Sequence, residues 1–209
     1  MKEKPDGQSQ QVWFCNRALW WTGSMEREDF QRVVVIGTSG SGKTTLAERL
    51  SAALGHEHIE LDAIHWLPDW EMRPLEEFRG KVTEAITGET WVVDGNYSKV
   101  RDIVWGRATT VVWLNYSRGV VLCRIVTRTL KRSLRREVLF SGNQETLSKA
   151  LFSKDSIVAW SMGTFARRRR EYPQLFKEAA YEHLNVVELR HPKQAVVLVE
   201  MINRKRNEK

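Results

Sequence analysis

The residues best suited to chemistry form one glycine-rich segment, Gly37-Thr38-Ser39-Gly40-Ser41-Gly42-Lys43-Thr44-Thr45. Its spacing is that of a P-loop, in which glycines let the backbone curl until several amide N–H groups point at phosphate oxygens. The start of a following helix adds further donors and a positive dipole end. Lys43 would reach the β- and γ-phosphates, and the Thr44 hydroxyl would face Mg²⁺. The segment therefore predicts binding of a nucleoside triphosphate together with magnesium.

The flanking sequence supplies the elements that must position this loop. The apolar run at residues 33–36 predicts a strand, and the apolar residues of 46–54 recur at helical spacing. Strand, glycine-rich turn and helix are the context in which a P-loop match is meaningful. A glycine-rich loop without function is the alternative, and this context makes it the weaker interpretation.

Two carboxylates follow further predicted strands. Residues 58–61 predict a second strand ending at Asp62, and residues 91–93 predict a third ending at Asp94. The carboxyl ends of parallel strands line the ligand crevice, so both acids should lie beside the phosphates. Asp94 has the form of a Walker B acid, which with Thr44 would hold Mg²⁺ directly or through water. The aromatic residues of 63–70 either wall an acceptor pocket or pack as a surface loop.

The later chain predicts further elements and concentrates arginine. Helices are predicted at 75–87, 117–136, 150–162 and 195–202, and strands at 110–114 and 185–189. Arg124, Arg128 and Arg132 recur four residues apart and so share one face of their helix. Such like charges repel, and an anion between them would relieve that cost. A solvated basic face is the alternative. A second basic run, 167–170, follows the predicted helix at 150–162.

Composition limits the class of protein. The 209 residues are 42% apolar and 28% charged, which is typical of one folded globular domain. No apolar run reaches the roughly 20 residues of a membrane span. Cys15 and Cys123 lie far apart and predict neither a disulfide framework nor a metal cluster, so we expect a cytoplasmic protein. The net charge of +7 fits either a nucleic-acid surface or a pocket for several phosphates.

The first residues differ from the rest of the chain. Residues 1–24 are polar and aperiodic at first and then aromatic without a clear period. One hypothesis makes Met25 the original start and residues 1–24 a loose extension; the other makes them a tryptophan-rich flap on the domain or a partner. We expect residues 25–209 to form a single domain.

These motifs together resemble the small P-loop kinases of the adenylate kinase type. The sequence is similar in particular to the bacterial branch described as DNA topology modulation or adenylate-kinase-related proteins, over about residues 32–200. The resemblance is carried by the P-loop, Leu61-Asp62 with Trp66 and Trp70, residues 91–97, and the Arg124/Arg128 pair. It implies an α/β, three-layer P-loop NTPase fold, with a five-stranded parallel sheet, helices on both faces and a small helical lid at about 124–170.

The resemblance also implies roles for individual residues. In such kinases two arginines four apart open the lid, one stacking on the ATP base and one contacting phosphates, and Arg124 and Arg128 match this spacing. An arginine after the lid clamps the phosphates, for which Arg168 is the candidate. Asp94 would lie near magnesium and the acceptor. Asp62 would bind, and could deprotonate, an acceptor hydroxyl, as in kinases of small hydroxyl compounds.

Two departures from the family pattern concern the acceptor. Asp94-Gly95-Asn96-Tyr97-Ser98 stands where adenylate kinases have Asp-Gly-Phe-Pro-Arg, so the arginine that holds a nucleoside monophosphate is missing there. Strand four ends in Asn115 where the related branch usually has Asp.

The sequence predicts a phosphotransferase that moves the γ-phosphoryl group of Mg-ATP to a small acceptor. The alternative is a nucleic-acid-associated P-loop ATPase or regulator, supported by the basic charge and the tryptophans. No helix-turn-helix, zinc or single-strand-binding signature accompanies these features.

Overall fold

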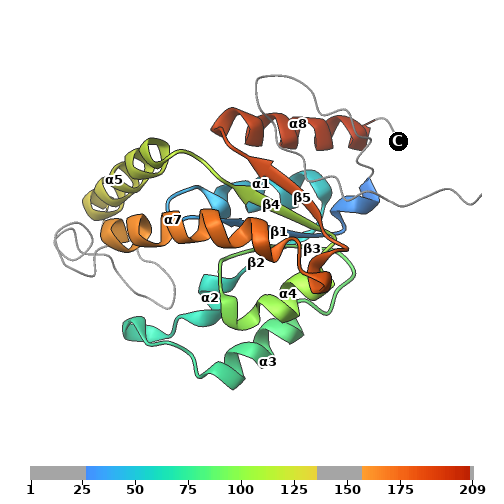
Figure 1. Ribbon diagram of the computed structural model, residues 1–209, viewed down its shortest axis with the longest axis horizontal. Helices are drawn as coiled ribbons and strands as arrows, with labels where there is room; N and C mark the ends of the chain where they lie inside the picture. Colours follow the sequence, from blue (N-terminus) through green and yellow to red (C-terminus); the bar gives the residue numbers. More distant parts are fainter. Residues whose placement is uncertain (1–26, 136–156, 208–209) are drawn as a thin grey trace, which may run out of the picture.

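A computed structural model describes residues 27–135 and 157–207 of the chain (Figure 1). The predicted extension 1–24 and residues 136–156, the middle of the predicted lid, lie outside the described residues. Within the described part, no helix is both long enough and apolar enough to cross a membrane.

One parallel sheet forms the centre of the molecule. Its strands are β1 (Arg32–Gly37), β2 (Glu57–Glu60), β3 (Trp91–Asp94), β4 (Thr110–Leu114) and β5 (Asn185–Leu189). They are hydrogen-bonded in the order β2-β3-β1-β4-β5, and every pairing is parallel. The chain crosses from one side of β1 to the other between β3 and β4. In sheets of this kind such a switch point, at the carboxyl ends of the strands, is where ligands bind.

Helices cover both faces of the sheet (Figure 1). On one face α1 (Lys43–Leu54) packs against α8 (Pro192–Asn207), and on the other lie α3 (Leu75–Ala85) and α4 (Arg101–Arg107). The side chains of β1 alternate between the two hydrophobic cores, Val33 and Val35 entering the first and Val34 and Ile36 the second. Burial on both faces explains why the three central strands β3, β1 and β4 are largely apolar runs.

Two longer helices flank the undescribed segment. They are α5 (Arg118–Arg135) and α7 (Ile157–Leu175), which lie side by side beyond the sheet (Figure 1). The end of α7 is fixed to α4 by an aromatic cluster, in which the Trp105 ring stacks on Phe176 at 5.5 Å and lies 6.1 Å from Tyr172. Within residues 27–135 and 157–207 the short elements are α2 (Leu61–His65) and four 3-10 turns, at Arg27–Phe30, Pro68–Trp70, Ser98–Val100 and Ala179–Tyr181.

Three sequence predictions are corrected by these bounds. The second strand ends at Glu60, and Asp62 lies in the first turn of α2, because Leu61 leaves the sheet to start that helix. The helix predicted at 150–162 is described from Ile157 and continues to Leu175, so the arginines 167–170 lie inside α7 and not after a helix. Helix α4 was not predicted, since its seven residues are too few for a clear period.

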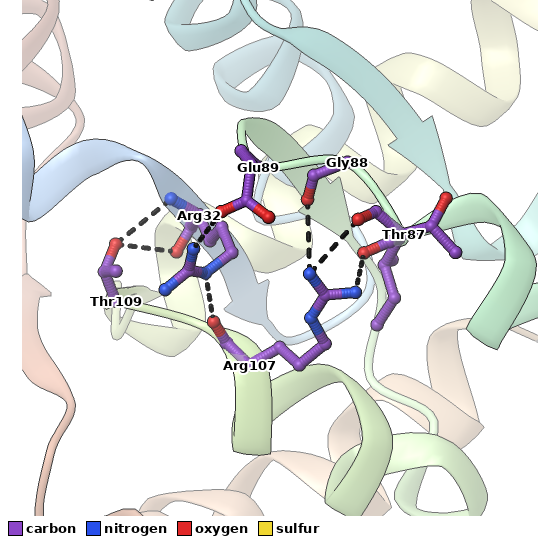
Figure 2. A network of polar contacts seen from close by, with 7 residues as sticks. Arg32, Thr87, Gly88, Glu89, Arg107 and Thr109 are labelled. Atoms are coloured by element: carbon purple, nitrogen blue, oxygen red, sulfur yellow. Dashed lines mark hydrogen bonds and ion pairs between the residues drawn. The ribbon is translucent and has the colours of Figure 1, made fainter.

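Two arginines connect neighbouring elements at the amino-terminal end of the central strand β1, opposite the P-loop (Figure 2). Arg107 donates to the carbonyl oxygens of Ile86 at 2.6 Å and of Thr87 at 3.2 Å, just beyond the end of α3. Arg32 donates in turn to the carbonyl oxygen of Arg107, at the end of α4. Because the last carbonyls of a helix have no partner within the helix, these guanidinium groups satisfy them and join α3, α4 and β1.

We predict that Arg107→Met lowers the free energy of unfolding by about 1–2 kcal/mol, since the carbonyl oxygens lose a charged donor while the aliphatic stem remains. Urea unfolding measures the change. Arg49→Met, an exposed position on α1, is the matched control. Equal stability of the two variants would contradict this role for Arg107.

Candidate active site

The P-loop curls tightly at the carboxyl end of β1. Gly40 has φ +79°, and a Cβ there would lie 2.2 Å from Cγ1 of Ile125 on α5. The Ser41 amide donates to the carbonyl oxygen of Thr38 at 3.0 Å, and the Ser41 side chain is fully buried. Only glycine fits both the left-handed backbone and the contact with α5. The loop is therefore closed onto α5, which carries the predicted lid arginines.

Helix α1 begins without a side-chain cap or an acidic residue in its first turn. Its N-cap is Gly42, and Lys43, Thr44 and Thr45 form the first turn. The first amides of a helix need partners from outside the helix, and an anion satisfies them. The side chains of Lys43 and Thr44 are partly buried, whereas that of Thr45 is exposed.

Arg124 lies directly against the loop. Its Nη1 donates to the carbonyl oxygen of Ser41 at 2.5 Å, and its guanidinium lies 5.2 Å from the centre of the Tyr116 ring. A Cβ on Gly42 would be 3.0 Å from the same Nη1. Arg124 thus lies against the P-loop beside Ser41 and Gly42. Arg128 lies half-buried one turn further along α5.

The ammonium group of Lys43 is affected electrostatically by the other predicted catalytic residues. Burial lowers the pKa of its ammonium, the negative charges of Asp62 and Asp94 raise it, and the positive charges of Arg168 and Arg128 lower it. These residues come from α1, α2, β3, α7 and α5. The structure therefore brings all five predicted catalytic residues within electrostatic reach of one point.

A cluster of carboxylates lies on the other side of Thr44. Asp94 is 1% exposed and pairs with Nε2 of His58 at 3.4 Å, and this contact raises the pKa of His58. Glu60 lies beside Asp94 in the register of β2 and β3, and Oγ1 of Thr44 donates to its Oε1 at 3.3 Å. Burial, followed by the charges of Asp94 and Asp62, raises the pKa of Glu60 to about 7.

These groups suit a magnesium ion. A hydroxyl and carboxylate oxygens are the hard donors that Mg²⁺ prefers, and the carboxylate of Asp94 is buried, with Oδ2 3.4 Å from Nε2 of His58. Burial is the largest cause of the raised pKa of Glu60, and the charges of Asp94 and Asp62 add to it. A divalent cation would offset this repulsion between neighbouring carboxylates. Thr44 and Asp94 thus fit the predicted role, with Glu60 as a further donor.

Asp62 faces a different group of side chains. The Tyr97 hydroxyl donates to its Oδ1 at 2.5 Å, and the His65 ring lies 4.5 Å from the Tyr97 ring. Burial, and then the charge of Asp62, raises the pKa of Tyr97, so this hydroxyl keeps its proton and its role as donor. Gly95 permits the arrangement, because its φ is +138° and a Cβ there would lie 2.8 Å from Cβ of Leu61.

Asn96 joins the two sides of the site. Its Oδ1 accepts hydrogen bonds from the Gly37 amide at 3.1 Å and from the Tyr172 hydroxyl of α7 at 3.2 Å. Its amide group also donates to the carbonyl oxygen of Gly37. The start of the P-loop, the turn after β3 and α7 are therefore fixed to one another through one side chain.

Beside Asn96 the structure opens into a polar pocket of about 430 Å³. It lies between the turn after β3, the first turn of α4 and the inner side of α7, and Arg168, which is 8% exposed, contributes to its wall. Trp66 and Trp70 belong to the segment 63–70, which was predicted either to wall an acceptor pocket or to pack as a surface loop. They pack edge-to-face on each other at 5.6 Å in the loop between α2 and α3.

The comparisons with known proteins agree with this geometry. Residues 33–207 match a family described as an AAA domain. The chain belongs to this AAA-domain family. Since the match runs from β1 into α8, all five strands and the P-loop of this AAA-domain protein lie within it.

Individual relatives of this AAA-domain protein are distant. The Uncharacterized protein YqaC of Bacillus subtilis (strain 168) is 28% identical over 129 residues, which are 61% of this chain and 72% of the relative. A shikimate kinase from Acinetobacter baumannii, solved in complex with shikimate, is 18% identical with a TM-score of 0.50 and covers 85% of this chain and 94% of its own. A gluconokinase from Sinorhizobium meliloti 1021 is 19% identical with a TM-score of 0.45, over 84% of this chain and 89% of its own.

At this identity the shared structure concerns the fold. The predicted α/β P-loop NTPase fold is confirmed. The finer relationship to DNA topology modulation proteins stays a prediction.

Sequence reasoning missed Glu60, Tyr97 and Asn96 as parts of the site. Glu60 was read as a residue inside a strand that continued to Leu61, although an acid next to an apolar run was the available signal. Tyr97 and Asn96 follow Asp94-Gly95 and were quoted only for family resemblance. Their partners, Asp62 and Gly37, lie far from them in sequence, so no local pattern marks the contacts.

The raised pKa of Glu60 predicts a pH-dependent stability. Between the ordinary value of 4.5 and about 7 the folded protein holds a proton that the unfolded chain releases, so the free energy of unfolding falls as pH rises through this window. Because Glu60 is only half-buried, we expect a loss of about 1 kcal/mol.

Urea unfolding of the metal-free protein at several pH values between 4.5 and 8 tests this. The Glu60→Gln variant should become more stable than the wild type as pH rises, and Glu57→Gln, an exposed residue of the same strand, should not. Parallel pH dependences of the wild type and Glu60→Gln would contradict the assignment.

Proposed function

We propose that the protein is a phosphotransferase of the small-metabolite kinase type, which moves the γ-phosphoryl group of Mg-ATP to a small acceptor. The observation that carries this proposal is the convergence of Asp62, Asp94, Arg128 and Arg168 on Lys43 at the end of the P-loop. Phosphoryl transfer needs alignment and charge neutralisation more than covalent help. A structural neighbour whose fold is shared, the shikimate kinase, supports the same class of reaction.

Each part of the chain has a role in this proposal. The amides of the P-loop and of the first turn of α1 hold the phosphates, and Lys43 contacts the β- and γ-phosphoryl oxygens. Thr44, Asp94 and Glu60 would hold magnesium, which would supply positive charge beside the phosphates. Arg124, beside the loop, contacts the nucleotide. Arg128 and Arg168 stabilise the charge that develops on the transferred group and exclude water from it.

Asp62 is the acceptor-side carboxylate in this mechanism. One of its oxygens is held by the Tyr97 hydroxyl, so the side chain has a fixed direction. Its charge also acts on Lys43, which supports a position near the phosphates. We assign it to bind the acceptor hydroxyl and to take its proton as the new P–O bond forms.

An acceptor panel tests the reaction class. Nucleoside monophosphates and small hydroxyl metabolites are incubated with Mg-ATP, and ADP and the phosphorylated product are measured. Lys43→Ala should lower kcat/KM by roughly 100- to 1,000-fold, because one charge that stabilises the transition state is lost. Lys81→Ala, an exposed lysine on α3, is the matched control and should behave as the wild type. Slow ATP hydrolysis independent of every acceptor would instead favour the nucleic-acid-associated ATPase.

A second prediction concerns Tyr97, which positions Asp62. Tyr97→Phe removes the donor to Oδ1 of Asp62 but keeps the ring contacts, so kcat should fall about tenfold with KM for ATP unchanged. Tyr181→Phe, a partly exposed tyrosine after α7, is the control. An unchanged kcat in Tyr97→Phe would remove Tyr97 from the mechanism.

A further inference from the structure

The pocket beside Asn96 has the size and lining of a small-molecule site. Its volume of about 430 Å³ falls within the range in which proteins enclose small ligands. Its walls carry the amide of Asn96 and the hydroxyls of Ser98 and Tyr172. They also carry three guanidinium groups and two carboxylates, those of Arg101, Arg167, Arg168, Glu171 and Glu178. Such a lining suits a ligand that is itself polar and charged.

Arg101 is the arginine of this pocket whose charge is not neutralised by the protein. Its guanidinium lies 5.2 Å from the centre of the Trp105 ring, and no carboxylate of the described residues forms an ion pair with it. By contrast, Arg167 pairs with Glu171 at 3.6 Å, so this acid is already engaged. The Trp105 ring, buried in the aromatic cluster, holds the guanidinium in place without satisfying its donors.

Positive charge accumulates across the pocket. Burial lowers the pKa of Arg168, Tyr172 and Glu171 raise it, and the neighbouring charges of Arg167 and Arg101 lower it further. Guanidinium groups held this close repel one another, and an anion between them would convert the repulsion into charge-assisted hydrogen bonds.

Two residues of this pocket, Asn96 and Arg168, also act on the P-loop. Asn96 lines the pocket and also binds the amide and the carbonyl of Gly37, where the P-loop starts. Arg168 lines it as well, and its charge reaches Lys43. A molecule held here would therefore lie next to the phosphates of a nucleotide on Lys43.

We propose that this pocket binds an anionic group of the acceptor, a carboxylate or a phosphate ester, and that Arg101 determines this specificity. The inference rests on the proposed phosphotransferase function, since it names the class of molecule that receives the phosphoryl group. Arg101 recognises the anion as a planar donor over Trp105, Arg168 adds charge, and Ser98 offers a hydroxyl group.

Equilibrium binding tests the pocket without requiring turnover. Titration calorimetry with the full chain uses two matched sets of probes: glycerate, glycerol 3-phosphate and glycerol, and gluconate, glucose 6-phosphate and glucose. At least one anionic probe should bind saturably and its neutral counterpart at least tenfold more weakly, and the carboxylate and phosphate arms identify which anion is preferred. Arg101→Gln should weaken the anionic probe by roughly 10- to 100-fold.

Two further variants keep the test decisive. Arg101→Lys retains the charge but not the planar fork, so its affinity should lie between those of the wild type and Arg101→Gln. Arg49→Gln removes an exposed arginine from α1 and should bind as the wild type does. Equal affinity for neutral and anionic probes, no binding of any anionic probe, or anion binding unchanged in Arg101→Gln would overturn the proposal.

Failure of this inference is distinguishable from failure of the proposed function. Transfer from Mg-ATP to neutral acceptors, lost in Lys43→Ala, would leave the kinase and remove the anion site. Arg101-dependent anion binding, together with ATP hydrolysis that no acceptor stimulates, would keep the anion site and remove the kinase.

Discussion

The burial of one ammonium group is the constraint on which the rest of the site depends. Lys43 stands at the start of α1 with its pKa lowered by burial, and a charge in such a place is tolerated only beside opposite charges. Asp62, in α2 directly after β2, and Asp94, at the end of the adjacent strand β3, supply these negative charges. Arg128 and Arg168 have the opposite effect on the pKa of Lys43. Positive charge at Lys43 is therefore disfavoured in the protein alone, and an anion such as polyphosphate would stabilise it.

The backbone around this point is fixed by contacts that leave little freedom. Gly40 fits against Ile125, Gly95 fits against Leu61, and neither position has room for a Cβ. Asn96 then ties the start of the P-loop to Tyr172 of α7. Preorganisation of this kind lowers the reorganisation that would otherwise accompany catalysis, because the dipoles and charges already point at the reacting group.

How far the sequence predicts the structure depends on how local the signal is. The P-loop is one contiguous segment, and β1, β3 and β4 are mostly apolar runs buried on both faces, so their positions could be predicted. Glu60 could not, because Leu61 continues the apolar pattern of the strand although it is the first residue of α2. The role of Arg101 could not either, since it stands in a seven-residue helix and its neighbours across the pocket come from α7.

The nucleotide side and the acceptor side of the proposed reaction differ in the same way, since one is a contiguous loop and the other consists of residues distant in sequence. Phosphates are held mainly by backbone amides of one loop, so many sequences can build the nucleotide side as long as the glycines and Lys43 remain. In the proposed reaction the acceptor would be held by side chains on α2, α4 and α7, which lie far apart in the sequence. Fold similarity at 18% identity shows the fold and leaves the acceptor to be inferred from this chain's own residues. Asp62, Tyr97 and Arg101 are the side chains through which the acceptor would be chosen.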